Sequence, residues 1–238
     1  MNYGILLSGG TGSRIRSEIP KQYIRSEGHM MVTLSLAALL RSPYIDRVHI
    51  VADEAWREDI SADAEDEGLP MDKLGDFAEP GVNRQGSILN AMEVILKQGG
   101  EAGNDDTVLI HDAARPFLTA ELIEACHEAL PGHDGVMPVL PMKDTVYLSK
   151  DGRTVSELID RSTVYAGQAP ELFLLKPYYK ANIKLVPEKI LKINGASEPA
   201  VLDGMDIAMI PGDEGNYKVT TAADLEKFLD AAKERTGV

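Results

Sequence analysis

The stretch Tyr3–Arg14, YGILLSGGTGSR, joins a short apolar run directly to a glycine-rich loop. Tyr3–Leu7 is typical of a buried strand, because it is apolar and ends at turn-forming residues. The glycines of the loop let the backbone turn sharply and approach a ligand without Cβ clashes. Successive backbone N–H groups in such a turn can bind phosphate oxygens. The sequence therefore predicts a phosphate-binding loop directly after the first strand.

Two standard phosphate-binding motifs do not fit this loop. A dinucleotide fingerprint that begins at Gly10 needs glycine at position 15, which is Ile15, and no Gly-Lys-Ser/Thr of a P-loop follows. Instead Arg14 ends the loop, and Pro20-Lys21-Gln22 comes shortly after it. Nucleotidyl transfer builds negative charge at the α-phosphorus and on the departing pyrophosphate, and fixed cations stabilise that charge. Arg14 and Lys21 suit this chemistry; the alternative is a tight turn with two solvated cations.

Strand-like and helix-like segments alternate along the rest of the chain. Continuous apolar strands that alternate with helices predict a mostly parallel sheet covered on both faces. Thr119 and Thr221 have the position and chemistry of helix N-caps. The predicted strands are Arg47–Ala52, Thr107–Ile110, Gly135–Leu140, Asp206–Ile210 and Tyr217–Val219, and the predicted helices are Thr33–Arg41, Glu54–Glu67, Arg84–Gln98, Ala120–Leu130 and Ala222–Arg235.

The pattern changes between Met142 and Gln168. This segment holds two short extended runs, Thr145–Leu148 and Val164–Ala166, with the turn signal Asp151-Gly152 between them. It reads as a hairpin or an arm that leaves the main body.

Composition narrows the functional class. The 238 residues fit one α/β domain with or without a projecting element, and 38 acidic against 24 basic residues give a net charge of −14. Such a surface repels a polyanion, so we expect no nucleic-acid partner. Cys126 is the single cysteine, which excludes an intrachain disulfide and a Cys-based zinc site. We find no signal peptide and no membrane-length apolar run, and predict a cytoplasmic protein without a membrane partner.

Several motifs follow one another along the chain: Gly9–Arg14 with Pro20–Tyr23, Arg84–Ser87, His111–Pro116, Asp144-Thr145, Asp160-Arg161, Gln168–Pro170 and Asn216–Thr221. Together they resemble the motifs of the cytidylyltransferases that act on 2-C-methyl-D-erythritol 4-phosphate or ribitol 5-phosphate. The resemblance implies a doubly wound, Rossmann-like nucleotidyltransferase domain of GT-A type over residues 1–238. It also implies CTP, Mg²⁺, release of pyrophosphate, and a homodimer in which the β-arm 142–168 reaches into the neighbouring subunit.

The same resemblance implies roles for individual residues. The residues implied as catalytic are Arg14, Lys21, Arg161 and Lys218; Arg161 and Lys218 would also bind the acceptor phosphate together with Thr145. Asp112 would hold Mg²⁺. The nucleotide-binding set would be Ser8, Gly9, Gly10, Gly12, Gly81, Arg84, Ser87, Asp112 and Ala113.

The residue chemistry leaves other roles open for some of these positions. Asp112 can be a turn carboxylate, Ser87 a helix cap, and Arg161 a solvated residue of a hairpin. His111 fits packing and hydrogen bonding better than general-base catalysis, and Asp53 reads as a loop acid.

The acceptor is the least determined part of the prediction. The family usually has Thr-Pro-Gln where this chain has Ala169-Pro170-Glu171, and it also differs at Ser197–Ala200. His111–Arg115 resembles the methylerythritol enzymes of isoprenoid biosynthesis, whereas Gly9-Gly10 and Tyr165–Gln168 resemble the ribitol enzymes of cell-wall polymer synthesis. We favour methylerythritol phosphate. Ribitol phosphate, a sugar-phosphate nucleotidyltransferase and a non-catalytic nucleotide-binding protein are the alternatives.

Overall fold

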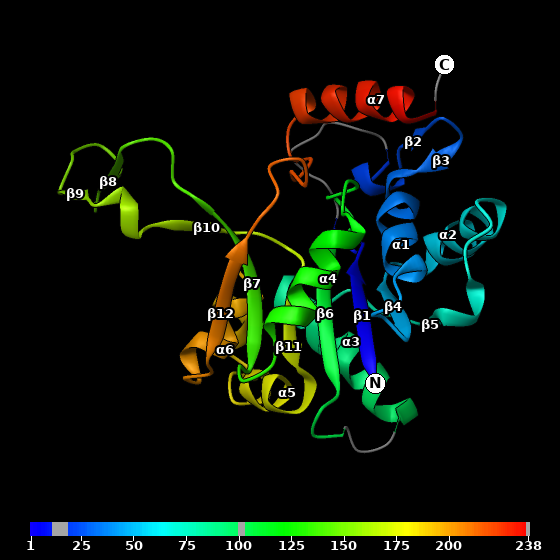
Figure 1. Ribbon diagram of the computed structural model, residues 1–238, viewed down its shortest axis with the longest axis horizontal. Helices are drawn as coiled ribbons and strands as arrows, with labels where there is room; N and C mark the ends of the chain where they lie inside the picture. The colour runs from blue at the N-terminus through cyan, green and yellow to red at the C-terminus, as the bar shows by residue number, and fades with distance from the viewer. Residues whose placement is uncertain (11–18, 100–102, 237–238) are drawn as a thin grey trace.

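The computed structural model describes residues 1–10, 19–99 and 103–236. A mixed, mostly parallel eight-stranded sheet runs through the molecule in the order β10-β7-β11-β6-β1-β4-β5, with β12 paired to β7 (Figure 1). Strands β10 and β11 are antiparallel to their neighbours. The strands are β1 Asn2–Leu7, β4 Arg47–Val51, β5 Leu74–Ala78, β6 Thr107–Asp112, β7 Gly135–Pro141, β10 Tyr165–Gly167, β11 Glu171–Leu174 and β12 Ile207–Pro211.

Helices cover both faces of the sheet, which confirms the predicted α/β class. Successive strand residues point to opposite faces: Leu6 of β1 belongs to one apolar core and Ile5 to the other. The first core is shared with α1, α2 and α4, and the second with α3, α5 and α6. The helices are α1 Met31–Arg41, α2 Glu54–Asp66, α3 Arg84–Gly99, α4 Ala120–Ala129, α5 Leu175–Ile183, α6 Ser197–Leu202 and α7 Ala222–Thr236.

Strand β1 lies at a topological switch point. It pairs in parallel with β4 on one side and with β6 on the other, so that Leu7 is in register with both Val51 and Asp112. The chain builds β4 and β5 on one side of β1 before it crosses to β6. Open α/β sheets bind ligands outside the carboxyl ends of such strands. In Figure 1, α7 crosses above this end of the sheet.

Most of the predicted elements are confirmed within a residue or two. Thr119 accepts a hydrogen bond from the Leu122 amide, and Thr221 from the Asp224 amide, as expected for N-caps. The strand predicted over Tyr217–Val219 is wrong: this segment is irregular. Its Val219 amide donates to the Ala114 carbonyl, and the chain then enters α7. Strands β5 and β11 and helix α5 were not predicted.

The segment from Met142 to Gln168 contains a separate two-stranded sheet. Strand β8 Val146–Leu148 pairs with β9 Glu157–Ile159, and the connection passes through Gly152 at a φ of 69°. The second predicted run instead forms β10, which pairs with β7 of the main sheet and not with β8. Figure 1 shows the β8–β9 hairpin standing away from the sheet.

Short elements complete the described chain. They are β2 Arg25–Ser26, β3 His29–Met30 and the 3-10 turns Lys21–Tyr23, Met71–Lys73, Arg161–Thr163 and Lys189–Lys192. Among the helices in the described ranges, none combines the length and the apolar character needed to cross a membrane.

Candidate active site

A cleft of about 400 Å³ opens at the carboxyl ends of β1 and β6. Its size falls in the range of about 300–1,000 Å³ that is common for small-molecule sites. The cleft therefore lies where the strand order predicts a ligand site. Eight of the residues that the sequence assigns to the site line it: Gly9, Gly10, Lys21, Gly81, Arg84, Ser87, Asp112 and Lys218.

The described start of the glycine-rich loop is held by side chains from the next turn. Gln22 Nε2 donates to the carbonyls of Ser8 and Gly10 at 2.7 and 2.6 Å, and the Tyr23 hydroxyl donates to Ser8 at 2.8 Å. A Cβ on Gly9 would lie 2.7 Å from Pro80 Cγ, so the close approach of these segments requires glycine. Gly12 and Arg14 lie outside the described residues.

Lys21 reaches the cleft from the 3-10 turn that follows the loop. Its ammonium donates to the Val219 carbonyl at 2.5 Å. The Val219 amide in turn donates to the carbonyl of Ala114, just beyond β6, at 2.8 Å. These bonds bring three segments that are far apart in the sequence to one wall of the cleft.

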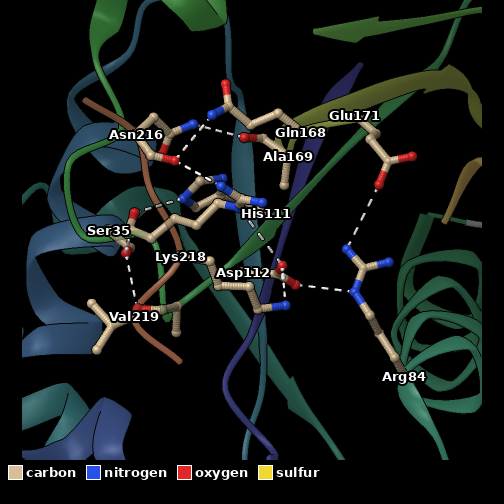
Figure 2. A network of polar contacts seen from close by, with 12 residues as sticks. Ser35, Arg84, His111, Asp112, Gln168, Ala169, Glu171, Asn216, Lys218 and Val219 are labelled. Atoms are coloured by element: carbon tan, nitrogen blue, oxygen red, sulfur yellow. Dashed lines mark hydrogen bonds and ion pairs between the residues drawn. The ribbon is translucent and has the colours of Figure 1, made fainter. Parts of the chain in front are cut away.

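Asp112 is the central carboxylate of the site. Arg84 Nε donates to one of its oxygens at 3.0 Å and Lys218 Nζ to the other at 2.8 Å, while Arg115 Nε lies 4.0 Å away (Figure 2). Burial by itself raises the pKa of Asp112, but the cations of Arg84 and Lys218 outweigh it and hold the pKa well below its usual range. The carboxylate is therefore ionised throughout the neutral range.

The first turn of α3 forms the opposite wall. Asn83 Oδ1 accepts from the Gly86 amide at 2.8 Å, which makes Asn83 the cap of this helix. The Ser87 hydroxyl accepts from the Gly81 amide at 2.9 Å and so holds the preceding loop against the helix. A Cβ on Gly81 would lie 2.3 Å from the backbone of Gly86, so this position tolerates only glycine.

The cleft has a charge opposite to that of the whole chain. Among its described lining residues, Lys21, Arg84 and Lys218 are basic and Asp112 alone is acidic, whereas the chain carries −14. Low-dielectric walls strengthen the field of such groups inside a cleft. The arrangement can therefore bind an anion that the average surface repels.

Among the described residues that line the cleft, one carboxylate, that of Asp112, could bind a divalent cation. Within the described part of the chain, no three His, Cys, Asp or Glu side chains gather closely enough to hold a metal. Mg²⁺ is commonly bound through one or two carboxylates together with substrate phosphates and water. A single buried, ionised Asp112 in a cleft lined by three cations fits that mode.

Four of the residues predicted for the site do not line the cleft. Ser8 and Ala113 are buried directly behind it, and the Ala113 amide donates to the Leu7 carbonyl at 3.0 Å. Thr145 and Arg161 lie in the segment of the β8–β9 hairpin and are exposed; Arg161 Nη1 donates to the Lys143 carbonyl at 2.6 Å. Within one chain, the structure does not bring these two residues to the cleft.

Other residues support the site without having been assigned to it. Arg115 Nη1 donates to the Asn216 carbonyl at 2.7 Å, and Asn216 Nδ2 donates to Ala169 at 2.7 Å, which anchors the loop that carries Lys218. Glu171 faces the same Arg84 guanidinium that pairs with Asp112 (Figure 2). In the sequence, the one indication that Gln22, Arg115 and Asn216 support the site is their position inside the family motifs.

The contacts of His111 and Asp53 indicate structural roles and not catalytic ones. His111 is fully buried, its Nε2 lies 3.0 Å from the Arg115 carbonyl, and burial lowers its pKa to about 4. Asp53 caps α2 by accepting from the Ala55 amide at 3.0 Å.

Known proteins resemble this chain over nearly its whole length. The family model described as IspD, 2-C-methyl-D-erythritol 4-phosphate cytidylyltransferase, matches residues 3–229. A protein of that name from Thermotoga neapolitana is 32% identical over 98% of this chain and 98% of its own length. A bifunctional enzyme IspD/IspF from Maricaulis maris is 32% identical over 94% of this chain, which spans only 55% of that longer protein.

Solved structures share the fold. The 4-diphosphocytidyl-2C-methyl-D-erythritol synthase of Anaerococcus prevotii superposes with a TM-score of 0.80 at 23% identity, covering 98% of this chain and 96% of its own.

Proposed function

This chain belongs to the 2-C-methyl-D-erythritol 4-phosphate cytidylyltransferase family, and from that membership we propose that it transfers CMP from CTP to methylerythritol phosphate. A phosphate oxygen of the acceptor attacks the α-phosphorus of CTP, and the bond from that phosphorus to the pyrophosphate breaks. The observation that carries the proposal is a cation-lined cleft at the switch point of the sheet, built from the family's motifs.

The cations of the cleft supply the electrostatic part of this reaction. The attacking phosphate is already deprotonated at neutral pH, so the step needs no general base. Negative charge grows on the α-phosphoryl oxygens and on the leaving pyrophosphate, and Lys21 faces the side of the cleft next to the glycine-rich loop. We assign Lys21 to the triphosphate, together with Arg14. We assign Lys218 to the acceptor phosphate, which it holds for attack.

Arg84, Ser87 and Gly81 form the wall that we assign to the nucleoside. The Ser87 hydroxyl and the Gly81 backbone are held by their own hydrogen bond, so this wall is rigid before a ligand arrives. We assign Asp112 to Mg²⁺, which would neutralise phosphate charge when bound. The part of this chain is to keep that carboxylate ionised and fixed between Arg84 and Lys218.

We propose that the β-arm, residues 142–168, completes the site in a homodimer. The arm exposes large apolar side chains: Tyr147 is 58% exposed and Leu158 64% exposed. Exposed apolar side chains grouped on one hairpin favour a protein interface. Across such an interface, Thr145 and Arg161 of one subunit would face the acceptor side of the other. Sedimentation measurements on Tyr147→Asp and Leu158→Asp variants test this, and an unchanged mass would contradict it.

The test of function is a substrate panel. The protein is incubated with CTP, Mg²⁺ and either methylerythritol phosphate, ribitol phosphate or a sugar phosphate, and pyrophosphate and the CDP product are measured. We expect release only with methylerythritol phosphate. Release only with ribitol phosphate would move the chain to the ribitol activity, and CTP binding without release for any acceptor would indicate a non-catalytic protein.

A variant pair tests the role of the cleft cations. Lys21→Ala is expected to lower kcat by roughly 10²–10³, the usual loss for one such donor. Lys184→Ala removes a lysine that pairs with Asp203 at the surface, between α5 and α6, and is expected to leave kcat unchanged. Equal rates for the two variants would remove Lys21 from the mechanism.

A further inference from the structure

Glu171 is a buried carboxylate beside the cleft that the proposed mechanism does not use. It is the first residue of β11 and is 7% exposed, and it does not line the cleft. The residue between it and the ligand space is Arg84. We propose that Glu171 is a positioning residue for Arg84, which it holds at the cleft wall so that the guanidinium meets the nucleotide. This inference rests on the proposed function.

The Arg84 guanidinium contacts two carboxylates through neighbouring nitrogens. Its Nε donates to Asp112 at 3.0 Å, and its neighbouring Nη2 lies 3.7 Å from Glu171 Oε1 (Figure 2). A guanidinium is planar, so contacts at Nε and at Nη2 together fix both its position and the direction of its plane. With Asp112 alone, the rest of the group could rotate about that one bond.

Asp112 and Glu171 differ in the number of other cations that they contact. Asp112 is shared with Lys218 at 2.8 Å, and we also assign it to the metal. Glu171 makes its ion pair with Arg84 and accepts hydrogen bonds from the backbone amide and the hydroxyl of Ser197 at the start of α6. Glu171 is therefore the carboxylate that can retain Arg84 when Asp112 is occupied by other cations.

Burial strengthens the ion pair between Glu171 and Arg84. The Glu171 side chain is 9% exposed, that of Asp112 10%, and that of Arg84 23%, so water competes weakly for these groups. The ion pair between Glu171 and Arg84 is therefore only weakly screened by solvent and salt.

The test is a double-mutant cycle on nucleotide binding. Affinity for CTP with Mg²⁺ is measured by calorimetry, and KM and kcat are measured with the acceptor, for Glu171→Ala, Arg84→Ala and the double variant. We expect Glu171→Ala to weaken CTP binding about tenfold, which is a common size for coupled neighbours, with a smaller change in kcat. The double variant should bind no more weakly than Arg84→Ala, since Glu171 acts through Arg84.

Conservative variants separate positioning from general stability. Glu171→Gln keeps an acceptor oxygen in the same place and should restore CTP affinity to within about threefold of the parent. Asp203→Ala breaks an ion pair between the ends of α5 and α6 without touching Arg84, and should leave CTP affinity unchanged. Should Glu171→Ala not fold, Ser197→Ala, which removes one of the donors to Glu171, is expected to weaken CTP binding about two- to threefold.

Three results would overturn the inference: unchanged CTP affinity in both Glu171→Ala and Ser197→Ala, a fully multiplicative double variant, or an equal loss in Asp203→Ala. These failures differ from failure of the proposed function, in which the parent protein itself releases no pyrophosphate with any acceptor.

Discussion

Replacing Asp112 with Asn tests whether this carboxylate is the counter-ion that holds the cleft together. The substitution keeps the shape and one acceptor oxygen but removes the charge between Arg84 at 3.0 Å and Lys218 at 2.8 Å. The bond to buried Arg84 has the value of a charge-assisted hydrogen bond, about 1.5–3 kcal/mol. Lys218 is 35% exposed, so solvent screening reduces its share to about 0–1 kcal/mol. We therefore expect Asp112→Asn to lower the free energy of unfolding by about 2–3 kcal/mol.

The assay is urea unfolding of the metal-free protein, followed by circular dichroism in EDTA. For a domain of this size, about 2–3 kcal/mol corresponds to a fall in Tm of about 4–12 °C, which thermal melts check independently. The control is Glu214→Gln, which removes an exposed ion pair with Lys143 and should leave both values unchanged. If Asp112→Asn were as stable as the parent, or more stable, with an unchanged m-value, Asp112 would not be offsetting cation repulsion in the free protein.

Three further predictions address the scaffold. Asp63 of α2 accepts from Thr33, the Met30 amide and Arg25; burial raises its pKa, but these donors lower it overall. Asp63→Asn should thus cost about 2–3 kcal/mol at pH 7 in urea unfolding. That difference should shrink as the pH falls below about 4, where the unfolded carboxyl takes up its proton, and a difference independent of pH would contradict it. Gly81→Ala forces a Cβ to 2.3 Å from the Gly86 carbonyl carbon and should lower both Tm and CTP affinity. At Gly10 no atom of the described residues lies within 4 Å of an added Cβ, so Gly10→Ala should leave Tm unchanged. Burial raises the pKa of the Cys126 thiol to about 12, so a thiol reagent at pH 8 should label the protein only after urea is added, and rapid native labelling would show that the thiol is accessible.

The fold was predictable where the apolar pattern is strong. Strands β1, β4, β6 and β7 lie inside the sheet and read as continuous apolar runs, because both faces of a parallel sheet are buried. Strand β11 was missed because it is four residues long, and its antiparallel place between β6 and β7 depends on tertiary pairing. The same applies to the hairpin, in which β8 pairs with Glu157–Ile159, an exposed run without alternation.

The site was predictable at positions where a residue type is required by a motif. Gly81 and Lys21 belong to this group. Gly81 must be glycine because a Cβ would clash with the backbone of Gly86, and Lys21 supplies a positive charge to the cleft. The segment Tyr217–Val219 shows where local patterns fail to predict structure. Its apolar ends suggest a strand, but the segment is irregular and the Lys218 side chain donates a hydrogen bond to Asp112 in the cleft. Glu171 was noticed only as a departure from the family pattern. Its contact with Arg84 depends on how β11 meets α3, which no local pattern encodes.

The charge of the cleft explains why the oxygens that bind its cations matter as much as the cations themselves. Lys21, Arg84 and Lys218 come from three separate segments, and each is held by an oxygen of the protein: the Val219 carbonyl for Lys21, and Asp112 for the other two. Cations brought together without such partners would repel each other and move apart, and their reorganisation would then oppose ligand binding. With these oxygens in place, the three cations are already positioned for the phosphate groups that we propose the cleft binds. An anionic ligand then meets groups whose positions are set, in a protein whose net charge of −14 would otherwise keep it away.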